Sequence, residues 1–241
     1  MDFLEDLGVE AYKVASYELV DIPLIRYIAS KGKPMIISTG MGNIEEIEEA
    51  VQACKDEHNE QIVLLKCCSE YPAPWKDMKL GNIPDMKERF GLPIGLSDHS
   101  FGSLGAVVGV TLGACVVEKH VKIDGVESAD AAFSMTMGEY KSMIEDCRNA
   151  KMIAAGPDYE LTASEQASTV FRRSIYASAD IKAGDKFTED NVRVIRPGYG
   201  LKPKCYEQLI GTVAKRDIGF GERIVGSDVS EEALKEVTKN R

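Results

Sequence analysis

Five short apolar runs recur through the first two thirds of the chain at the spacing of a strand–helix repeat. The predicted strands span residues 9–15, 34–38, 61–67, 91–96 and 114–120, and successive strands begin about 22 to 31 residues apart. These intervals are long enough for a helix, which a crossover between neighbouring parallel strands requires. Residues 1–155 are therefore expected to form an α/β fold, with one parallel sheet and helices outside it.

Helix-start signals lie between these strands. Asp21 can cap a helix that has Pro23 in its first turn, and Asn43 precedes Glu46 in the arrangement of a capping box. A last helix is predicted over 138–154. The result is five consecutive βα units, whereas a closed (β/α) barrel has eight. The sequence leaves two topologies open, an open sheet or a barrel without its first units.

The remainder of the chain has a different texture. Residues 156–170 are polar and predict a linker, and residues 171–230 hold short β-like runs separated by turns, which predict a small β-rich domain. Within it, the segments 180–185 and 217–222 resemble each other and suggest two similar half-units. A charged helical tail is expected over 231–241.

Charge and composition exclude several classes of partner. The 29 basic and 39 acidic residues give a net charge of −10, so neither nucleic acid nor an anionic membrane is an expected partner. The six cysteines form no CxxC pair, which is typical of reduced thiols in a cytoplasmic protein. No apolar run reaches the ~18 residues of a membrane span, and the N-terminus lacks the features of a secretion signal.

Two of the three histidines close predicted strands. His99 follows Ser97 and Asp98, and His120 follows Glu118 and Lys119, 21 residues later. A single histidine beside an apolar run is more often a core residue with a satisfied hydrogen bond, but a pair at the ends of two strands of one sheet can share a metal ion. Because few carboxylates accompany them, Mn²⁺ or Mg²⁺ with water ligands is favoured over structural zinc. Asp98 can alternatively cap the following helix.

Other strand ends carry groups suited to an anion. Lys13, Ser16, Ser38 and Ser97 supply an ammonium and three hydroxyls, and the glycine-rich turn 40–42 offers backbone N–H groups where a helix starts. Each serine alone is typical of a turn. Their convergence on one rim of the sheet predicts a phosphate-binding site.

The motifs at these strand ends resemble the sialic acid synthase family, which condenses phosphoenolpyruvate with amino sugars to give nonulosonic acids. The similar segments are Lys13-Val14-Ala15-Ser16, Ile36-Ile37-Ser38-Thr39-Gly40-Met41, Tyr71-Pro72-Ala73-Pro74, Gly95-Leu96-Ser97-Asp98-His99 and Glu118-Lys119-His120. Further on, Phe171-Arg172-Arg173-Ser174 and Ile195-Arg196-Pro197-Gly198 resemble the antifreeze-like SAF domain of that family. The resemblance implies a partial TIM barrel with five of eight βα units, over 1–155, followed by a SAF domain over 171–230.

The resemblance also implies residue roles. Phosphoenolpyruvate would be bound by Lys13, Ser16, Ser38 and Ser97; His99 and His120 would hold the metal; Glu18 would stabilise a cation at carbon 2; and Ser69, Tyr71, Asp130 and Arg196 would bind the sugar. Arg196 would reach the active site of the partner subunit in a domain-swapped homodimer.

Within the family, Lys66 and the segment 129–134 are more similar to pseudaminic acid synthases than to N-acetylneuraminate synthases, and a legionaminate synthase is a further alternative. The resemblance further implies three βα units that precede this chain in other members. A truncated homologue without activity, acting as a carbohydrate-binding or oligomerisation module, is the alternative of a different class.

Overall fold

The structure is a computed structural model that describes residues 1–229. Contacts divide the chain into two compact units, Met1–Gly156 (unit 1) and Pro157–Arg241 (unit 2), and each is described by itself. The predicted tail over 231–241 lies outside the described residues.

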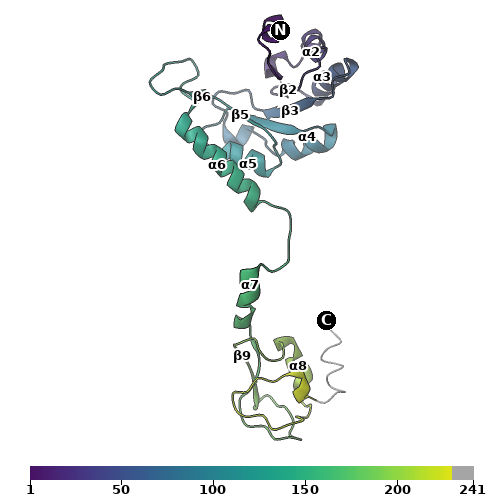
Figure 1. The fold of residues 1–241 in the computed structure, drawn as a ribbon, viewed down its shortest axis with the longest axis vertical. Helices are drawn as coiled ribbons and strands as arrows, with labels where there is room; N and C mark the ends of the chain where they lie inside the picture. The colour runs from purple at the N-terminus through teal and green to yellow at the C-terminus, as the bar shows by residue number, and fades with distance from the viewer. Residues whose placement is uncertain (230–241) are drawn as a thin grey trace. The chain divides into compact units, whose positions relative to one another are not determined.

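Unit 1 is built on a five-stranded parallel sheet with the strand order β1-β2-β3-β4-β5. Its strands are β1 (Tyr12–Val14), β2 (Met35–Ser38), β3 (Ile62–Cys67), β4 (Ile94–Asp98) and β5 (Val117–Lys119). Its helices are α1 (Asp2–Asp6), α2 (Ile22–Ala29), α3 (Ile44–Asp56), α4 (Asn82–Phe90), α5 (Leu104–Thr111) and α6 (Met137–Ile153), with 3₁₀ turns at Ser16–Glu18 and Trp75–Asp77. Helices alternate with strands along the chain, as predicted, and Figure 1 shows them around the sheet.

The sheet is curled. β1 and β5 are its two outermost strands, and four inter-strand steps of about 4.8 Å would separate them in a flat sheet. Even so, Lys13 Nζ on β1 lies 3.3 Å from Glu118 Oε2 on β5. The two edges therefore approach each other across the concave face, and the sheet is a half-barrel rather than an open layer.

Strand alternation sends one set of side chains to the helices and the other to the concave face. The helix-facing set, which includes Met35, Ile37, Leu64 and Leu96, packs with α2, α3 and α4 in one buried apolar cluster. Burying each such side chain contributes about 1.5–3 kcal/mol. This core holds the strands, and with them the residues at their carboxyl ends.

Local signals set the helix starts. Asp21 accepts a hydrogen bond from Leu24 N at the start of α2, and Asn43 and Glu46 form the predicted capping box of α3. The expectation that Asp98 caps the next helix is wrong, since no side chain caps α5. Asp98 belongs instead to β4, which runs two residues further than predicted because Asp98 pairs in register with Lys119 of β5.

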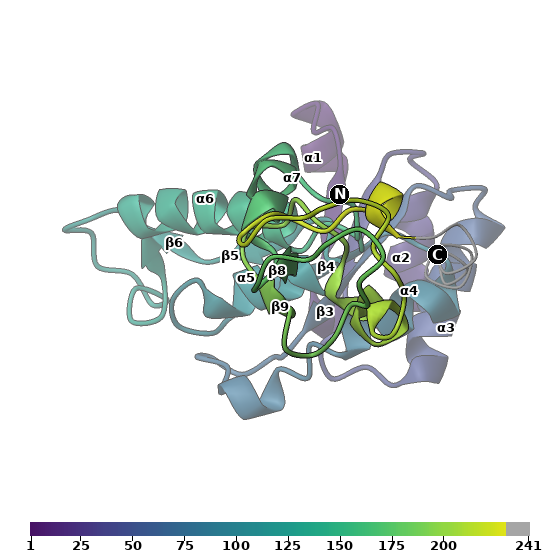
Figure 2. The ribbon, with the colours of Figure 1, turned by 90° about the horizontal axis from the view of Figure 1, so that it is seen from below.

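After β5 the chain leaves the sheet. β6 (Val121–Lys122) pairs in parallel with β7 (Met135–Thr136), and the residues between them form an exposed loop. β7 leads directly into α6, which lies beside β6 (Figure 2).

Unit 2 begins with the short helix α7 (Ala163–Ser168), inside the segment predicted as a linker. A 3₁₀ turn at Thr169–Phe171 precedes β8 (Ser174–Ala177), which forms an antiparallel pair with β9 (Val192–Ile195). A 3₁₀ turn at Pro203–Cys205, α8 (Tyr206–Leu209) and a 3₁₀ turn at Gly226–Asp228 follow. The two similar segments meet: Ile181 and Ile218 bond to each other through their backbones. Unit 2 has its own buried cluster, which includes Ile175, Phe187 and Leu209.

Candidate functional site

The carboxyl ends of the five strands meet on the concave side of the half-barrel, where polar side chains contact one another. Glu118 joins two of the predicted phosphate ligands, because its Oε2 lies 3.3 Å from Lys13 Nζ and its Oε1 accepts a 2.6 Å hydrogen bond from Ser97 Oγ. Glu118 lies two residues before His120, so strand alternation puts both on the same face, but the sequence motifs gave Glu118 no role. Glu118 is the counter-ion of Lys13, and an anionic ligand that binds Lys13 would have to displace Glu118.

The turn after β2 brings the ends of β1, β2 and β3 together. Gly40 N donates a 3.1 Å hydrogen bond to Ser16 Oγ. A Cβ atom on Gly40 would lie 2.1 Å from Ser69 Oγ and 2.7 Å from Ser16 Oγ, so only glycine fits at this position. Ser38 is buried, and among residues 1–229 its hydroxyl has no hydrogen-bond partner. A buried hydroxyl without a partner is costly, and a ligand oxygen would satisfy it.

The two strand-end histidines lie side by side. The ring centroids of His99 and His120 are 5.3 Å apart. His99 Nδ1 lies 2.9 Å from the Cys68 carbonyl oxygen, which can only accept, and His120 Nδ1 lies 3.4 Å from Asp130 Oδ2. With oxygen partners at Nδ1, Nε2 of each ring is the candidate ligand atom, as is usual for metal-binding histidines. His99 Nε2 lies 3.5 Å from Ser97 Oγ, a long contact that an ion would replace.

The separation of the two rings is compatible with a single divalent ion. Two imidazoles that bind one ion through bonds of about 2.1 Å bring their ring centres to within roughly 6 Å of each other, which the observed separation satisfies. Among residues 1–229, no group of three or more His, Cys, Asp or Glu side chains is arranged to hold a metal. Two nitrogen ligands leave several coordination positions for water and substrate, which suits a catalytic rather than a structural ion.

Aromatic rings border the imidazole pair. The Tyr71 ring centroid lies 4.1 Å from that of His99 and 5.9 Å from that of His120. Phe133 lies 5.1 Å from His120 and 5.5 Å from Tyr71 by the same measure. Sequence reasoning gave Phe133 no role of its own, and its three-residue distance from Asp130 was the available signal.

Cys67, at the end of β3, faces the same side. Its Sγ lies 3.9 Å from His99 Nδ1 and 3.8 Å from Ser69 Oγ. Burial disfavours the thiolate, but hydrogen bonds from His99 and Ser16 outweigh burial and lower the pKa of Cys67 to about 7. Burial likewise disfavours the imidazolium, but the bonds to Cys67 and to the Cys68 carbonyl raise the pKa of His99. The two groups therefore favour each other's charged forms.

The other residues singled out from the sequence are Glu18, Lys66 and Arg196. Glu18 is half-buried in the 3₁₀ turn after β1, and within residues 1–229 its carboxylate forms no hydrogen bond or ion pair with either imidazole. Lys66 points away from Cys67 by strand alternation, and its Nζ donates a 2.6 Å hydrogen bond to the Cys67 carbonyl. Arg196 is exposed and belongs to unit 2.

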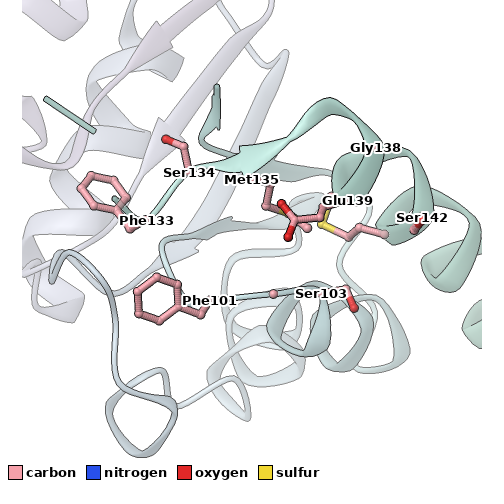
Figure 3. A pocket seen from close by; sticks show the side chains of 10 residues that line it. Phe101, Ser103, Phe133, Ser134, Met135, Gly138, Glu139 and Ser142 are labelled. Carbon is pink, nitrogen blue, oxygen red and sulfur yellow. The ribbon is translucent and has the colours of Figure 1, made fainter. Parts of the chain in front are cut away.

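A cavity of about 620 Å³ lies beside the site, between the loop after β4 and the start of α6 (Figure 3). It shares Phe133 with the aromatic border, and Phe101, Ser134 and Glu139 also line it. Glu139 already caps α6 through Thr136. None of the imidazoles or predicted phosphate ligands lines this cavity. The candidate site is thus the open concave rim itself.

Comparison with known proteins identifies the family of the chain. The model of the NeuB family matches residues 1–158, and that of the SAF domain matches residues 172–230. The chain is 42% identical to the pseudaminic acid synthase of Campylobacter jejuni over 95% of its own length and 67% of that protein. It is 35% identical to the N,N'-diacetyllegionaminic acid synthase of the same species, over 93% of this chain and 68% of that one.

A solved structure agrees with the fold. The crystal structure of the spore coat polysaccharide biosynthesis protein SpsE from Bacillus subtilis superposes with a TM-score of 0.61 at 35% identity, over 95% of this chain and 70% of that one. The predicted partial barrel followed by a SAF domain is confirmed. The chain belongs to the NeuB family, and it carries a SAF domain after its half-barrel.

Proposed function

We propose that the chain condenses phosphoenolpyruvate with the aldehyde form of an N-acetylated amino sugar, giving a nonulosonic acid and phosphate. The observation that carries the proposal is the meeting, on one rim, of a lysine and hydroxyl cluster suited to phosphate with two neighbouring imidazoles whose Nδ1 atoms face oxygen partners. A phosphorylated enol and an aldehyde need these two kinds of site side by side.

Each group has a proposed task. Lys13, Ser16, Ser38 and Ser97 bind the phosphate, and His99 and His120 hold a Mn²⁺ or Mg²⁺ ion through Nε2. That ion, when bound, polarises the aldehyde oxygen. Lys13 must exchange Glu118 for the phosphate as phosphoenolpyruvate enters.

The bonds then change in order. Carbon 3 of phosphoenolpyruvate attacks the aldehyde carbon, which leaves carbon 2 positively charged, and we assign the Glu18 carboxylate to stabilise that charge. Water adds to carbon 2, and the bond from carbon 2 to the phosphate oxygen breaks to leave a ketone. One proton of that water ends on the former aldehyde oxygen, which becomes a hydroxyl, and the other leaves with inorganic phosphate, which stays with Lys13 and the serines until release.

The sugar is assigned to Tyr71 and Asp130, which lie against the imidazoles, and to Ser69, which lies beside Cys67. We infer pseudaminic acid as the product, supported by the 42% identity to a pseudaminic acid synthase; a legionaminic acid is the second candidate, supported by 35% identity. We assign residues 1–155 to catalysis, 156–170 to a linker, and 171–230 to a SAF domain whose Arg196 completes the site of a second copy in a domain-swapped homodimer.

Phosphate release tests the proposal. The chain is incubated with Mn²⁺, phosphoenolpyruvate and either a diacetamido-hexose or a mono-acetamido-hexose, and free phosphate is measured. We expect turnover with the diacetamido sugar, its loss on metal chelation, and at least a roughly 100-fold lower rate for His120→Ala. His58→Ala, in a loop outside the site, is the matched control and should keep the parent rate.

Folded chain that releases no phosphate with either sugar would refute the catalytic proposal. Sugar binding or a dimer without turnover would then favour the binding and oligomerisation module.

A further inference from the structure

A buried ion pair lies directly behind the two histidines, on the helix-facing side of the sheet. Lys119 Nζ lies 2.8 Å from Asp98 Oδ2, and the two side chains are 1% and 0% exposed. Asp98 and Lys119 are register partners on β4 and β5, and each is the residue immediately before a histidine. Because side chains alternate along a strand, the pair and the imidazoles lie on opposite faces of the same two strand ends.

Hydrogen bonds extend this pair to the residue after His99. The second carboxylate oxygen, Asp98 Oδ1, accepts bonds from Ser100 N at 2.8 Å and from Ser100 Oγ at 2.7 Å. Lys119 Nζ also donates to the Ser100 carbonyl. The backbone on both sides of His99 is therefore tied to the residue that precedes His120.

Helix α5 covers the network closely. A Cβ atom on Gly105 would lie 2.7 Å from Ser100 Oγ and 3.0 Å from Asp98 Oδ2, so no larger residue fits there without displacement. A charged network so enclosed has little freedom to rearrange, and its polar atoms satisfy one another.

Stability alone does not explain this arrangement. Moving two charges out of water costs several kcal/mol for each ion, and an apolar pair of similar volume is often as stable as a buried ion pair or more so. What the ion pair adds is a fixed geometry between two particular backbone positions.

We propose that Asp98 and Lys119 are positioning residues that hold the ends of β4 and β5 so that both imidazoles address one divalent ion. This inference rests on the proposed function only in assigning His99 and His120 to a metal. The ion pair fixes the position of one strand end relative to the other. Through its hydrogen bonds to the pair, Ser100 also fixes the turn that orients His99.

The test replaces both charges by apolar residues of similar volume, in Asp98→Leu/Lys119→Met. A matched control, Arg26→Met/Asp56→Leu, removes an exposed ion pair of 2.6 Å that lies far from the imidazoles in sequence. Mn²⁺ affinity is measured by calorimetry, and the ligand nitrogens are followed by electron paramagnetic resonance. We expect the site variant to fold but to melt at a lower temperature than the parent, because Ser100 loses its hydrogen-bond partners. It should bind Mn²⁺ about 10–100-fold more weakly, as loss of an outer-shell partner does, and the control should bind as the parent does.

A second readout needs no metal. The chain has only three histidines, so the ring protons of His99 and His120 can be assigned by nuclear magnetic resonance. Their rings are 5.3 Å apart, and the nuclear Overhauser effect between them should be present in the parent and the control and absent in the site variant.

The outcomes separate the two proposals. If the parent binds no Mn²⁺, the metal assignment fails, while the ring contact still tests the positioning role. A folded site variant with parent-like Mn²⁺ affinity and ring contact overturns the inference. Asp98→Asn/Lys119→Met, which keeps a carbonyl for Ser100, replaces the site variant if that does not fold; if neither folds while the control does, the pair serves folding and the inference is also overturned.

Discussion

Burial changes the acid–base chemistry of single residues in this chain, and Cys54 on α3 shows it clearly. Its side chain is fully buried, with its Sγ 3.7 Å from Met35 Sδ. Because no charge or strong donor compensates, burial raises the pKa of Cys54 from 9.0 to about 11. Cys67 is also buried, yet its pKa is lowered because His99 and Ser16 donate to it. The neighbouring groups, rather than the extent of burial, decide whether the pKa of each thiol is raised or lowered.

Cys54 should make the chain sensitive to alkali. The pKa is raised on folding, so the unfolded thiol ionises first as pH rises. Stability from the neutral thiol is complete below pH 9 and falls by about 2–3 kcal/mol as pH approaches 11. Urea unfolding at pH 8 and pH 10.5 measures the decline, which should be smaller in Cys54→Ala. Equal declines in the two proteins would contradict the assignment to Cys54.

At the scale of the element, two helices carry the same start signal in different surroundings. α3 begins with the Asn43–Glu46 capping box and buries Ile47, Ala50 and Val51 against the sheet. α7 begins with the equivalent box of Thr162 and Glu165, but it has six residues and buries none. The same local motif is therefore expected to contribute differently to the free energy of unfolding, because a short helix without packing adds little to global stability.

Removing each cap should reveal this difference. Asn43→Ala leaves Glu46 N without its side-chain acceptor and should lower the free energy of unfolding by about 1 kcal/mol. Thr162→Ala, the matched change on α7, should shift it by less than about 0.5 kcal/mol. The midpoints of urea unfolding measure both values. Similar shifts for the two variants would mean that packing does not set the weight of a cap here.

At the scale of the whole molecule, the hydrophobic core of unit 1, which consists of two buried clusters, shares no member with the core of unit 2 among the described residues. The segment between them is polar, and Tyr159 within it is 96% exposed. None of the helices in the described part of the chain has the length and apolar character needed to cross a bilayer. Two separate cores joined by an exposed segment are expected to behave as two cooperative units.

Limited proteolysis measures that independence. Chymotrypsin should cut first after Tyr159, because an exposed segment is cleaved before packed elements open. Mass spectrometry should then show two resistant pieces that meet at residue 159, and Tyr159→Ser should delay their appearance. An initial cut within either core would show that the segment is not the most accessible part of the chain.

The order of elements could be predicted because its signals are local. The five apolar runs, the caps at Asp21 and Asn43 and the helix after β7 all depend on neighbours a few residues away. Strand ends were less accurate: β1 is shorter than predicted, and β4 starts three residues later and ends two residues later than predicted, since a strand ends where its ladder partners end. Helix α7 was not predicted within the linker segment, because its local signal is a capping box without an apolar stripe.

By itself, the sequence determined a parallel α/β unit, a second β-rich unit and the rim to which Lys13, Ser38, His99 and His120 belong. It could do so because the spacing of the strands and the residues that follow each strand depend on nearby sequence. Only the tertiary structure decided that Lys13 meets Glu118 across the half-barrel and that Phe133 borders the imidazoles. Asp98 illustrates the limit of local signals. Its sequence neighbours suggested a helix cap, but Asp98 forms an ion pair with Lys119 on another strand. Such contacts depend on how the sheet curls and which strands become neighbours, which no local pattern encodes.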